Sequence, residues 1–187
     1  MELTNREAKI LKLFSDKMDL VHLDQIKLVF GWRLFIADLK KLIFMYGFAL
    51  LMGCFIETLL IHVSFFTFRQ VAFGAHSKNF YICLVISCIV FPVSAVLLKG
   101  LEFSMMHIWI AYFIGALPLL LFAPIGTAVN AIRGTAHAQY LKKRIYIRLS
   151  IFAVVLLFLP IAIAKFLVAG LLVETITIMI SIIHKGD

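Results

Sequence analysis

Five long apolar segments constrain this chain more than any other feature of its sequence. They cover residues 42–62, 80–98, 105–123, 149–164 and 166–183. A helix needs about 20 apolar residues to cross the ~30 Å hydrocarbon core of a bilayer. Of the 187 residues, 63% are hydrophobic and 15% are charged, whereas soluble domains are about 45–50% apolar. We therefore predict an all-α, polytopic membrane protein, and we exclude a soluble domain, a disordered chain and a coiled coil.

The N-terminal region differs from the rest of the chain. Residues 1–41 contain eight Lys or Arg and six acidic residues and no uninterrupted apolar run, so we expect no signal peptide and a cytoplasmic location. Thr4 and Glu7 resemble a capping box, and apolar residues repeat at helical spacing over 4–30. These are Leu11, Phe14, Met18, Val21 and Leu28. The predicted amphipathic helix lies on the membrane or on the rest of the protein, or it receives a membrane-bound substrate.

Charge counting predicts one more crossing than the five segments provide. With a cytoplasmic N-terminus and five crossings, loop 125–148 would lie outside, although it holds five Lys or Arg and no acid. Cytoplasmic loops normally carry the excess of basic residues. A short helix or re-entrant segment at 63–75, interrupted by Arg69, restores the rule. We predict about six membrane-crossing or re-entrant helices over 42–183, with both termini and the basic loop in the cytoplasm.

No repeat or second domain is visible, so residues 1–187 are expected to form a single membrane domain. The last two apolar segments form one stretch interrupted only by Lys165 and Gly170, which predicts a tight helical hairpin. The formal net charge is +8. In a membrane protein, this charge indicates an anionic lipid bilayer or an acidic partner rather than nucleic acid.

Residues 69–88 hold the strongest candidate for chemistry. Gly74 can adopt a turn conformation closed to other residues, and Ser77 or Asn79 can cap the helix that follows. Cys83 would then lie in the first or second turn of that helix, where the helix terminus and a neighbouring imidazole stabilise a thiolate. His76 is the available base, provided that it lies on the turn before the helix, because seven helical residues would separate it from the thiol by about 10 Å. The alternative is that the cysteine fills apolar space and the histidine lies at the membrane interface.

Metal binding and disulfide formation are weaker interpretations of the same residues. The three cysteines, Cys54, Cys83 and Cys88, are odd in number and lie in apolar surroundings, which argues against a disulfide framework. His76, Cys83 and Cys88 have no fourth ligand at a recognisable zinc spacing. We expect neither a metal nor a cofactor.

The order Arg69, Gly74-Ala75-His76-Ser77, Cys83 and Ser87 resembles the signature of the AgrB family, the accessory gene regulator B membrane endopeptidases. That signature has an Arg, a Gly-rich turn, and a Cys seven residues after a His. The length, the apolar content, the basic N-terminal helix and the late basic loop are also similar.

This resemblance implies a cysteine endopeptidase that cleaves the C-terminal tail of an AgrD-type autoinducer pro-peptide in quorum sensing. It assigns the nucleophile to Cys83 and the base to His76, with Arg69, Gly74, Ser77 and Ser87 in supporting positions. The precursor core would remain as an acyl-thioester on the enzyme until an internal Cys or Ser of the precursor captures it as a thiolactone or lactone. The oxyanion would be stabilised by amide N–H groups near Cys83 or by Arg69, and a homodimer is the expected assembly.

The chain departs from the family pattern at two places. The turn reads Phe73-Gly74 where a Gly pair or His-Gly is common. Residues 123–127 read Ala-Pro-Ile-Gly-Thr where the family usually has an acid at the fourth position.

Charged residues inside and between the apolar segments complete the predictions. Glu57, Lys165 and Glu174 lie within apolar runs, where an ionisable group costs about 2.5–3.5 kcal/mol on insertion scales. We expect them to form structural pairs; the alternative is a small transporter or channel subunit whose path they line. A second alternative is a membrane scaffold without enzymatic activity. In loop 125–148, the residues Lys142, Lys143 and Arg144 are expected to hold the inner leaflet and to steer the acidic tail of the substrate.

Overall fold

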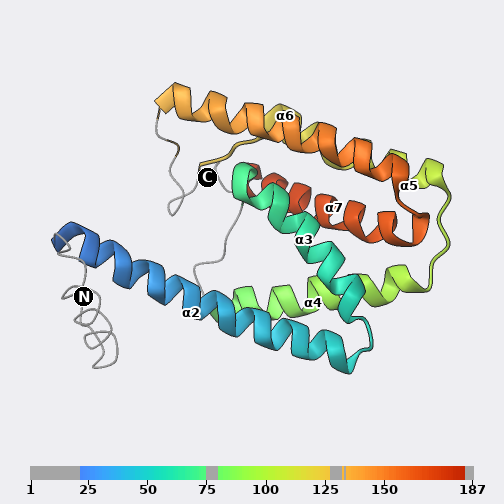
Figure 1. The fold of residues 1–187 in the computed structure, drawn as a ribbon, viewed down its shortest axis with the longest axis horizontal. Coiled ribbons are helices and arrows are strands. Elements are labelled where there is room, and N and C mark those ends of the chain that lie inside the picture. Colours follow the sequence, from blue (N-terminus) through green and yellow to red (C-terminus); the bar gives the residue numbers. More distant parts are fainter. Residues whose placement is uncertain (1–21, 75–79, 127–131, 133, 184–187) are drawn as a thin grey trace. The chain divides into compact units, whose positions relative to one another are not determined.

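A computed structural model describes residues 22–74, 80–126, 132 and 134–183. These residues form six helices, as drawn in Figure 1. The helices are α2 (His22–Leu51), α3 (Phe55–Ala72), α4 (Phe80–Lys99), α5 (Met105–Phe122), α6 (Gly134–Phe158) and α7 (Ile161–Ile183). The prediction of an all-helical chain is confirmed.

The chain divides into two compact units, Met1–Phe44 and Met45–Asp187. Of the first unit, the described residues belong to α2, where the Lys41 ammonium donates to Asp38 at 3.0 Å. The part of the predicted amphipathic helix before residue 22 lies outside the described residues. The remaining part, 22–30, is helical but belongs to a helix that continues to Leu51.

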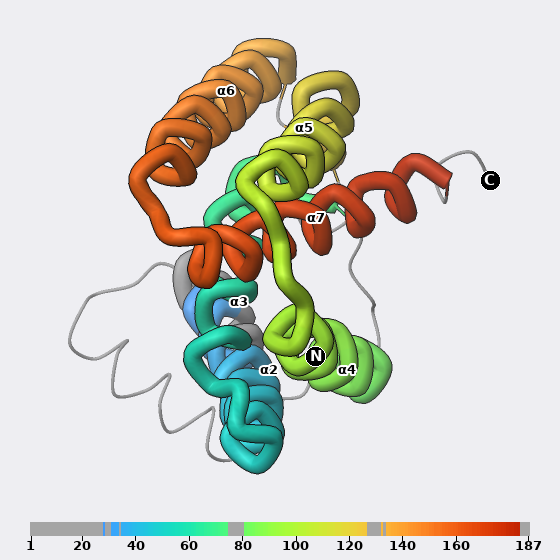
Figure 2. The backbone as a smooth tube through the Cα atoms, turned by 90° about the vertical axis from the view of Figure 1, so that its right-hand side faces the viewer, coloured from blue at the N-terminus to red at the C-terminus, as the bar shows by residue number. Residues whose placement is uncertain are grey.

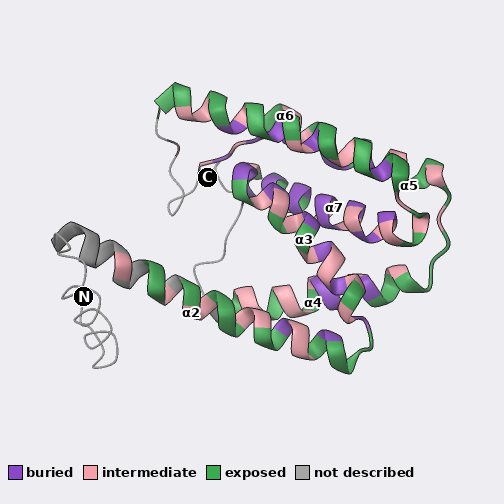
Figure 3. Cartoon of the chain, in the orientation of Figure 1, coloured by how far each residue is buried: buried purple, intermediate pink, exposed green. Residues whose placement is uncertain are grey.

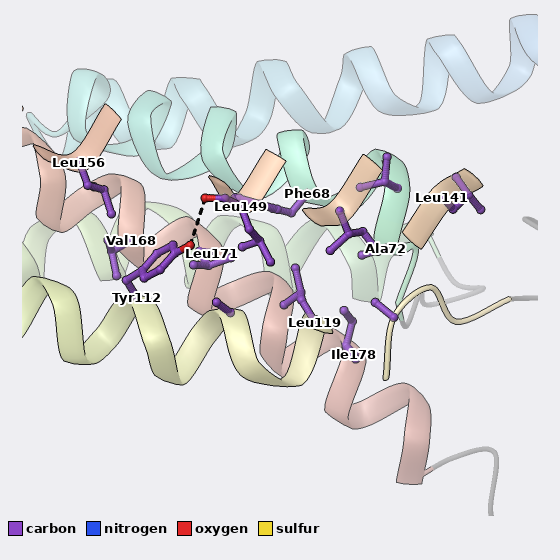
Figure 4. Close-up of a cluster of buried hydrophobic side chains, with 14 of the residues drawn as sticks. Phe68, Ala72, Tyr112, Leu119, Leu141, Leu149, Leu156, Val168, Leu171 and Ile178 are labelled. Carbon is purple, nitrogen blue, oxygen red and sulfur yellow. Dashed lines mark hydrogen bonds between the residues drawn. The ribbon is translucent and has the colours of Figure 1, made fainter. Parts of the chain in front are cut away.

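The core of the second unit lies where α7 packs against α3 and α5, an arrangement that can be followed in Figure 2. Gly170 allows the closest approach, because a Cβ there would overlap the carbonyl oxygen of Ile61 on α3. Figure 4 shows the apolar side chains that fill the space between these helices and α6. At its edge, the hydroxyl of Tyr112 on α5 donates to the carbonyl of Leu149 on α6 at 3.0 Å.

One end of this unit is defined by the side chains of two lysines, and we call it the Lys99 end. The Lys99 ammonium lies 3.1 Å from the Glu57 carboxylate and donates to the carbonyl of Gly53 at 3.0 Å. Lys165 donates to the carbonyls of Leu98 and Leu101 at 2.7 and 3.0 Å. The start of α3, the end of α4 and the start of α7 therefore lie together.

The opposite end, which we call the Gly74 end, joins the C-terminal ends of α3 and α5. Phe73 forms an isolated parallel bridge with Ile125, whose N–H donates to the carbonyl of Ala72 at 3.1 Å. Because α5 finishes at this end and α7 starts at the Lys99 end, α6 must carry the chain back between them. Helices α3 to α7 thus alternate in direction.

Among the described residues, three helices are long and apolar enough to cross a membrane, at Tyr81–Lys99, Met105–Phe122 and Ile161–Ile183. Buried residues are concentrated on α3 and α7, whereas α4 and the outward side of α6 expose many apolar side chains (Figure 3). Phe113 on α5 and Leu97 on α4 are each 63% exposed. So large an apolar surface suits contact with lipid, in agreement with the predicted membrane protein.

Segment 42–62, predicted as one apolar span, is divided between two helices. Helix α2 ends at Leu51 and α3 begins at Phe55. The turn contains Gly53 at φ +64°, and the N–H of Cys54 donates to the carbonyl of Ala49 at 3.0 Å. Hydropathy did not reveal this break, because the turn residues are themselves apolar. The predicted short segment 63–75 is the second half of α3, as far as Ala72.

Two further differences concern the C-terminal third of the chain. The hairpin over 149–183 is confirmed, but it turns at Leu159 and Pro160 rather than at the predicted interruptions, because proline has no N–H to continue a helix. The predicted loop 125–148 becomes helix α6 from Gly134 on. Its residues from 134 to 148 are therefore presented on a helix.

Candidate functional site

A buried charge pair links α3 and α7 at the Gly74 end. The Arg69 guanidinium Nη1 lies 3.6 Å from Glu174 Oε2 and donates to the hydroxyl of Thr177 at 3.1 Å. That hydroxyl lies 3.1 Å from the same carboxylate oxygen. The Glu174 side chain is completely buried, and that of Arg69 is 20% exposed. A charge in an apolar interior requires a partner of this kind.

Gly74 is pressed against this network. Its φ is +66°, and a Cβ built on it would stand 2.5 Å from Thr177 Oγ1 and 2.7 Å from Arg69 Nη1. The preceding residue, Phe73, also has a positive φ of 69°, and its N–H donates to the carbonyl of Arg69 at 3.2 Å. The path by which the chain leaves α3 is therefore fixed by the bridge to Ile125 on one side and by the charge network on the other.

Cys83 lies in the first turn of α4, as predicted from the turn residues before it. Its side chain is half-buried, and its carbonyl accepts a hydrogen bond of 2.8 Å from the hydroxyl of Ser87. The first N–H groups of a helix have no partner within the helix and stabilise a thiolate nearby. This position fits a reactive cysteine.

The other two cysteines have different surroundings. Cys54, predicted to lie in the middle of a span, is instead buried in the turn before α3 at the Lys99 end. Its Sγ lies 3.6 Å from the carbonyl oxygen of Ala49 and 3.7 Å from that of Pro92. Cys88 is half-buried one turn deeper in α4 than Cys83. All three cysteines are free.

The structure brings some of the predicted site residues together. Arg69 contacts Gly74, and Ser87 contacts Cys83, but within the described ranges no hydrogen bond or ion pair joins these two groups. Figure 1 shows the end of α3 and the start of α4 apart from each other. His76 and Ser77 lie outside the described residues. Among the residues that are described, no three His, Cys, Asp or Glu side chains could hold a metal ion together.

The expectation that the charged residues of the apolar segments form structural pairs is confirmed for Glu57 and Glu174. Glu57 and Lys165 lie at the Lys99 end, and Glu174 lies at the Gly74 end. The sequence interpretation missed Thr177 and the partnership of Glu174 with Arg69. The signal in the sequence was that Arg69 and Glu174 are both charged residues within apolar helices, where a charge requires an opposite partner.

The basic residues of α6 differ in their surroundings. Arg148 donates to the carbonyl of Thr67 and, at 3.2 Å, to the amide oxygen of Gln70, and so anchors α6 to α3. Lys143 and Arg144 are exposed, and Lys142 is half-buried. The Arg144 guanidinium lies 4.7 Å from the centre of the Tyr140 ring.

The family of the chain follows from comparison with known proteins. The sequence profile of the accessory gene regulator B family, AgrB, matches residues 7–178. The chain belongs to this family. No solved structure matches the chain significantly.

Curated AgrB relatives are similar over almost their whole length. The accessory gene regulator protein B of Staphylococcus haemolyticus (strain JCSC1435) is 29% identical over 94% of this chain and 93% of its own. That of Staphylococcus intermedius is 27% identical over 92% of this chain and 91% of its own. The protein of Staphylococcus aureus (strain bovine RF122 / ET3-1) is 23% identical over 98% and 97%. Membership of the AgrB family implies a role in the processing of a quorum-sensing autoinducer.

Proposed function

We propose that this AgrB protein is a membrane-embedded cysteine endopeptidase that cleaves the C-terminal tail of an AgrD-type pro-peptide. The observation that carries the proposal is the position of Cys83 in the first turn of α4, within a chain of the AgrB family. The other two cysteines are less suitable, because Cys54 is buried and Cys88 lies deeper in the helix.

The proposed reaction begins with transfer of the Cys83 thiol proton to the imidazole of His76. The thiolate attacks a backbone carbonyl carbon of the pro-peptide, and the resulting oxyanion accepts hydrogen bonds from N–H groups at the start of α4. When the C–N bond breaks, the imidazolium gives its proton to the amine of the departing tail. The precursor core remains bound to Cys83 as a thioester.

Release of the core then requires a second nucleophile. An internal thiol or hydroxyl of the precursor gives its proton to the neutral His76 and attacks the thioester carbonyl, which expels the Cys83 thiolate and closes a thiolactone or lactone ring. Exchange between thioesters is nearly balanced in free energy, and a nucleophile on the same chain has a high effective molarity. Exclusion of water protects the intermediate from hydrolysis.

The direct test uses an AgrD-type pro-peptide. We would co-express the pro-peptide, carrying a C-terminal epitope tag, with the enzyme and follow release of the tag and the mass of the remaining core. Release of the tag supports the proposal if the remaining core is lighter than the linear, hydrolysed core by one water, because ring closure removes one water. An intact tagged peptide contradicts it.

We further propose that the Gly74 end faces the cytoplasm and that residues 42–183 form about six membrane-crossing or re-entrant helices, with both termini inside. If α4 crosses the membrane, its first residue, Phe80, and its last residue, Lys99, lie on opposite sides. In a variant without native cysteines, single cysteines in place of Lys78 and Lys143 should resist a membrane-impermeant thiol reagent in intact cells. A cysteine in place of Lys99 should react. Labelling of position 78 or 143 from outside would overturn this topology.

Three basic residues of α6 are the proposed contact for the acidic tail of the pro-peptide. Lys142, Lys143 and Arg144 differ from Arg148, whose guanidinium is bonded to α3. Changing all three to Gln should slow tag release, most strongly at low salt, because such attraction is screened by ions. The amount of enzyme in the membrane should not change. If the triple variant cleaves normally, these residues serve only to hold the lipid.

A further inference from the structure

Glu174 differs from the other charged residues of the apolar helices. Glu57 pairs with Lys99 at 3.1 Å and is 19% exposed, and Lys165 donates to two carbonyls at the end of α4. Glu174 is completely buried, and its Oε1 has no hydrogen-bond partner in the part of the chain that the structure describes. Buried polar atoms almost always have a partner, so this carboxylate requires an explanation.

The crossing of α3 and α7 sets the position of this carboxylate. At Gly170, α7 has no side chain, and the hydroxyl of Ser64 on α3 donates to the carbonyl of Leu167 at 2.6 Å. One helical turn after Gly170, Glu174 faces Arg69, which lies five residues after Ser64. The close crossing therefore places the carboxylate at the Gly74 end of the bundle.

The charge network of Glu174, Arg69 and Thr177 is expected to contribute little to the stability of the fold. Buried ion pairs can often be replaced by apolar residues without loss of stability, and an unsatisfied oxygen adds a further cost. The pair is instead effective at holding the guanidinium in one place. If Glu174 is removed, Arg69 loses the buried carboxylate that lies 3.6 Å from its guanidinium.

What the carboxylate holds is the backbone at Gly74. Glu174 Oε2 lies 3.6 Å from Arg69 Nη1 and 3.1 Å from Thr177 Oγ1. These two atoms are the nearest neighbours that a Cβ at Gly74 would meet. The two side chains that Glu174 contacts therefore pack closely against the chain where it leaves α3. Two residues after Gly74 comes His76, the proposed base.

We propose that Glu174 is a positioning residue of the peptide-processing centre, acting through Arg69 and Thr177 on the backbone at Gly74. The inference rests on the proposed function of Cys83 and adds to it two residues on a helix far along the chain. Glu174 does not touch the peptide in this scheme. It fixes the starting point of the segment that carries the base.

The test compares Glu174→Gln with a matched control in vesicles that contain anionic lipid, again with a tagged AgrD-type pro-peptide. Gln has the same shape and still accepts a hydrogen bond from Thr177, but it has no charge to hold Arg69. We expect the maximal rate of tag release to fall roughly 10- to 100-fold, the order that a 1 Å misplacement costs. The pro-peptide concentration at half-maximal rate should not change. Glu57→Gln, which removes the half-buried carboxylate at the Lys99 end, should leave the rate unchanged.

Two further comparisons separate positioning from a structural role. The charge-exchanged variant Arg69→Glu with Glu174→Arg restores an ion pair but places a carboxylate against Gly74, so its abundance should recover and its activity should not. Thr177→Ser keeps the hydroxyl and should cleave at nearly the wild-type rate, whereas Thr177→Val should be slow. If Glu174→Gln fails to accumulate in the membrane, the comparison of the two Thr177 variants tests the proposal in its place.

The outcomes distinguish the two proposals. Tag release that survives Cys83→Ala overturns the proposed function and this inference together. If release requires Cys83 but is unchanged in Glu174→Gln, or is fully restored by the charge exchange, the inference alone is wrong. Equal rates for the Ser and Val variants of Thr177 also overturn it.

Discussion

Cys83→Ala is expected to abolish cleavage of the pro-peptide while leaving the amount of enzyme in the membrane unchanged. The side chain is half-buried in the first turn of α4, so its loss leaves no large cavity. Without the thiol there is no nucleophile and no thioester. Cys83→Ser should retain the shape but lose activity by orders of magnitude, because a hydroxyl of much higher pKa is a poor nucleophile with the same base. Release of the C-terminal tag from the pro-peptide measures both.

The other two cysteines provide the controls for this experiment. Cys54→Ala and Cys88→Ala should cleave at close to the normal rate; the first residue lies in the turn at the Lys99 end, and the second is about 140° around α4 from Cys83. His76→Ala should be as inactive as Cys83→Ala, and the double variant should be little worse, because the two residues act as one unit. A pro-peptide without its internal nucleophile should accumulate as a hydroxylamine-sensitive adduct on Cys83. Cleavage by Cys83→Ala would remove the assignment as a cysteine endopeptidase.

Gly74→Ala is expected to produce a loss of activity nearly as large. At φ +66° an L-residue is strained by about 1–2 kcal/mol. The new Cβ would also meet Thr177 Oγ1 at 2.5 Å and Arg69 Nη1 at 2.7 Å, and crowding of this kind costs about 1–3 kcal/mol. The backbone must shift to relieve both, and we expect tag release to fall about 100-fold.

Gly134 is the matched control for this substitution. It has a similar φ of +75° at the start of α6, but a Cβ there would have no atom within 4 Å. Gly134→Ala therefore carries the strain without the crowding, and it should cleave within a few-fold of the wild-type rate. Equal losses in the two variants would show that backbone strain alone, rather than contact with the charge network, explains the requirement for glycine.

The site was predictable to the extent that its chemistry depends on neighbours in sequence. The prediction that Cys83 lies in the first or second turn of a helix after the Gly74 turn is confirmed, because α4 begins at Phe80. The AgrB resemblance, drawn from the order of Arg69, Gly74, His76 and Cys83, is confirmed over residues 7–178. The roles of His76 and Cys83 in catalysis remain predictions that the variants above can test.

By itself, the sequence determined the helical, apolar character of this protein and the need of each buried charge for a partner. Both follow from local physics, because helix periodicity and the cost of burying a charge are properties of short segments. Only the tertiary structure decided that the partner of Arg69 is Glu174, more than a hundred residues away, and that Arg148 is bonded to α3. It also decided that the apolar run 42–62 is divided at Gly53. Such choices depend on how closely two helices can cross, and at Gly170 this depends on the backbone of a helix distant in sequence.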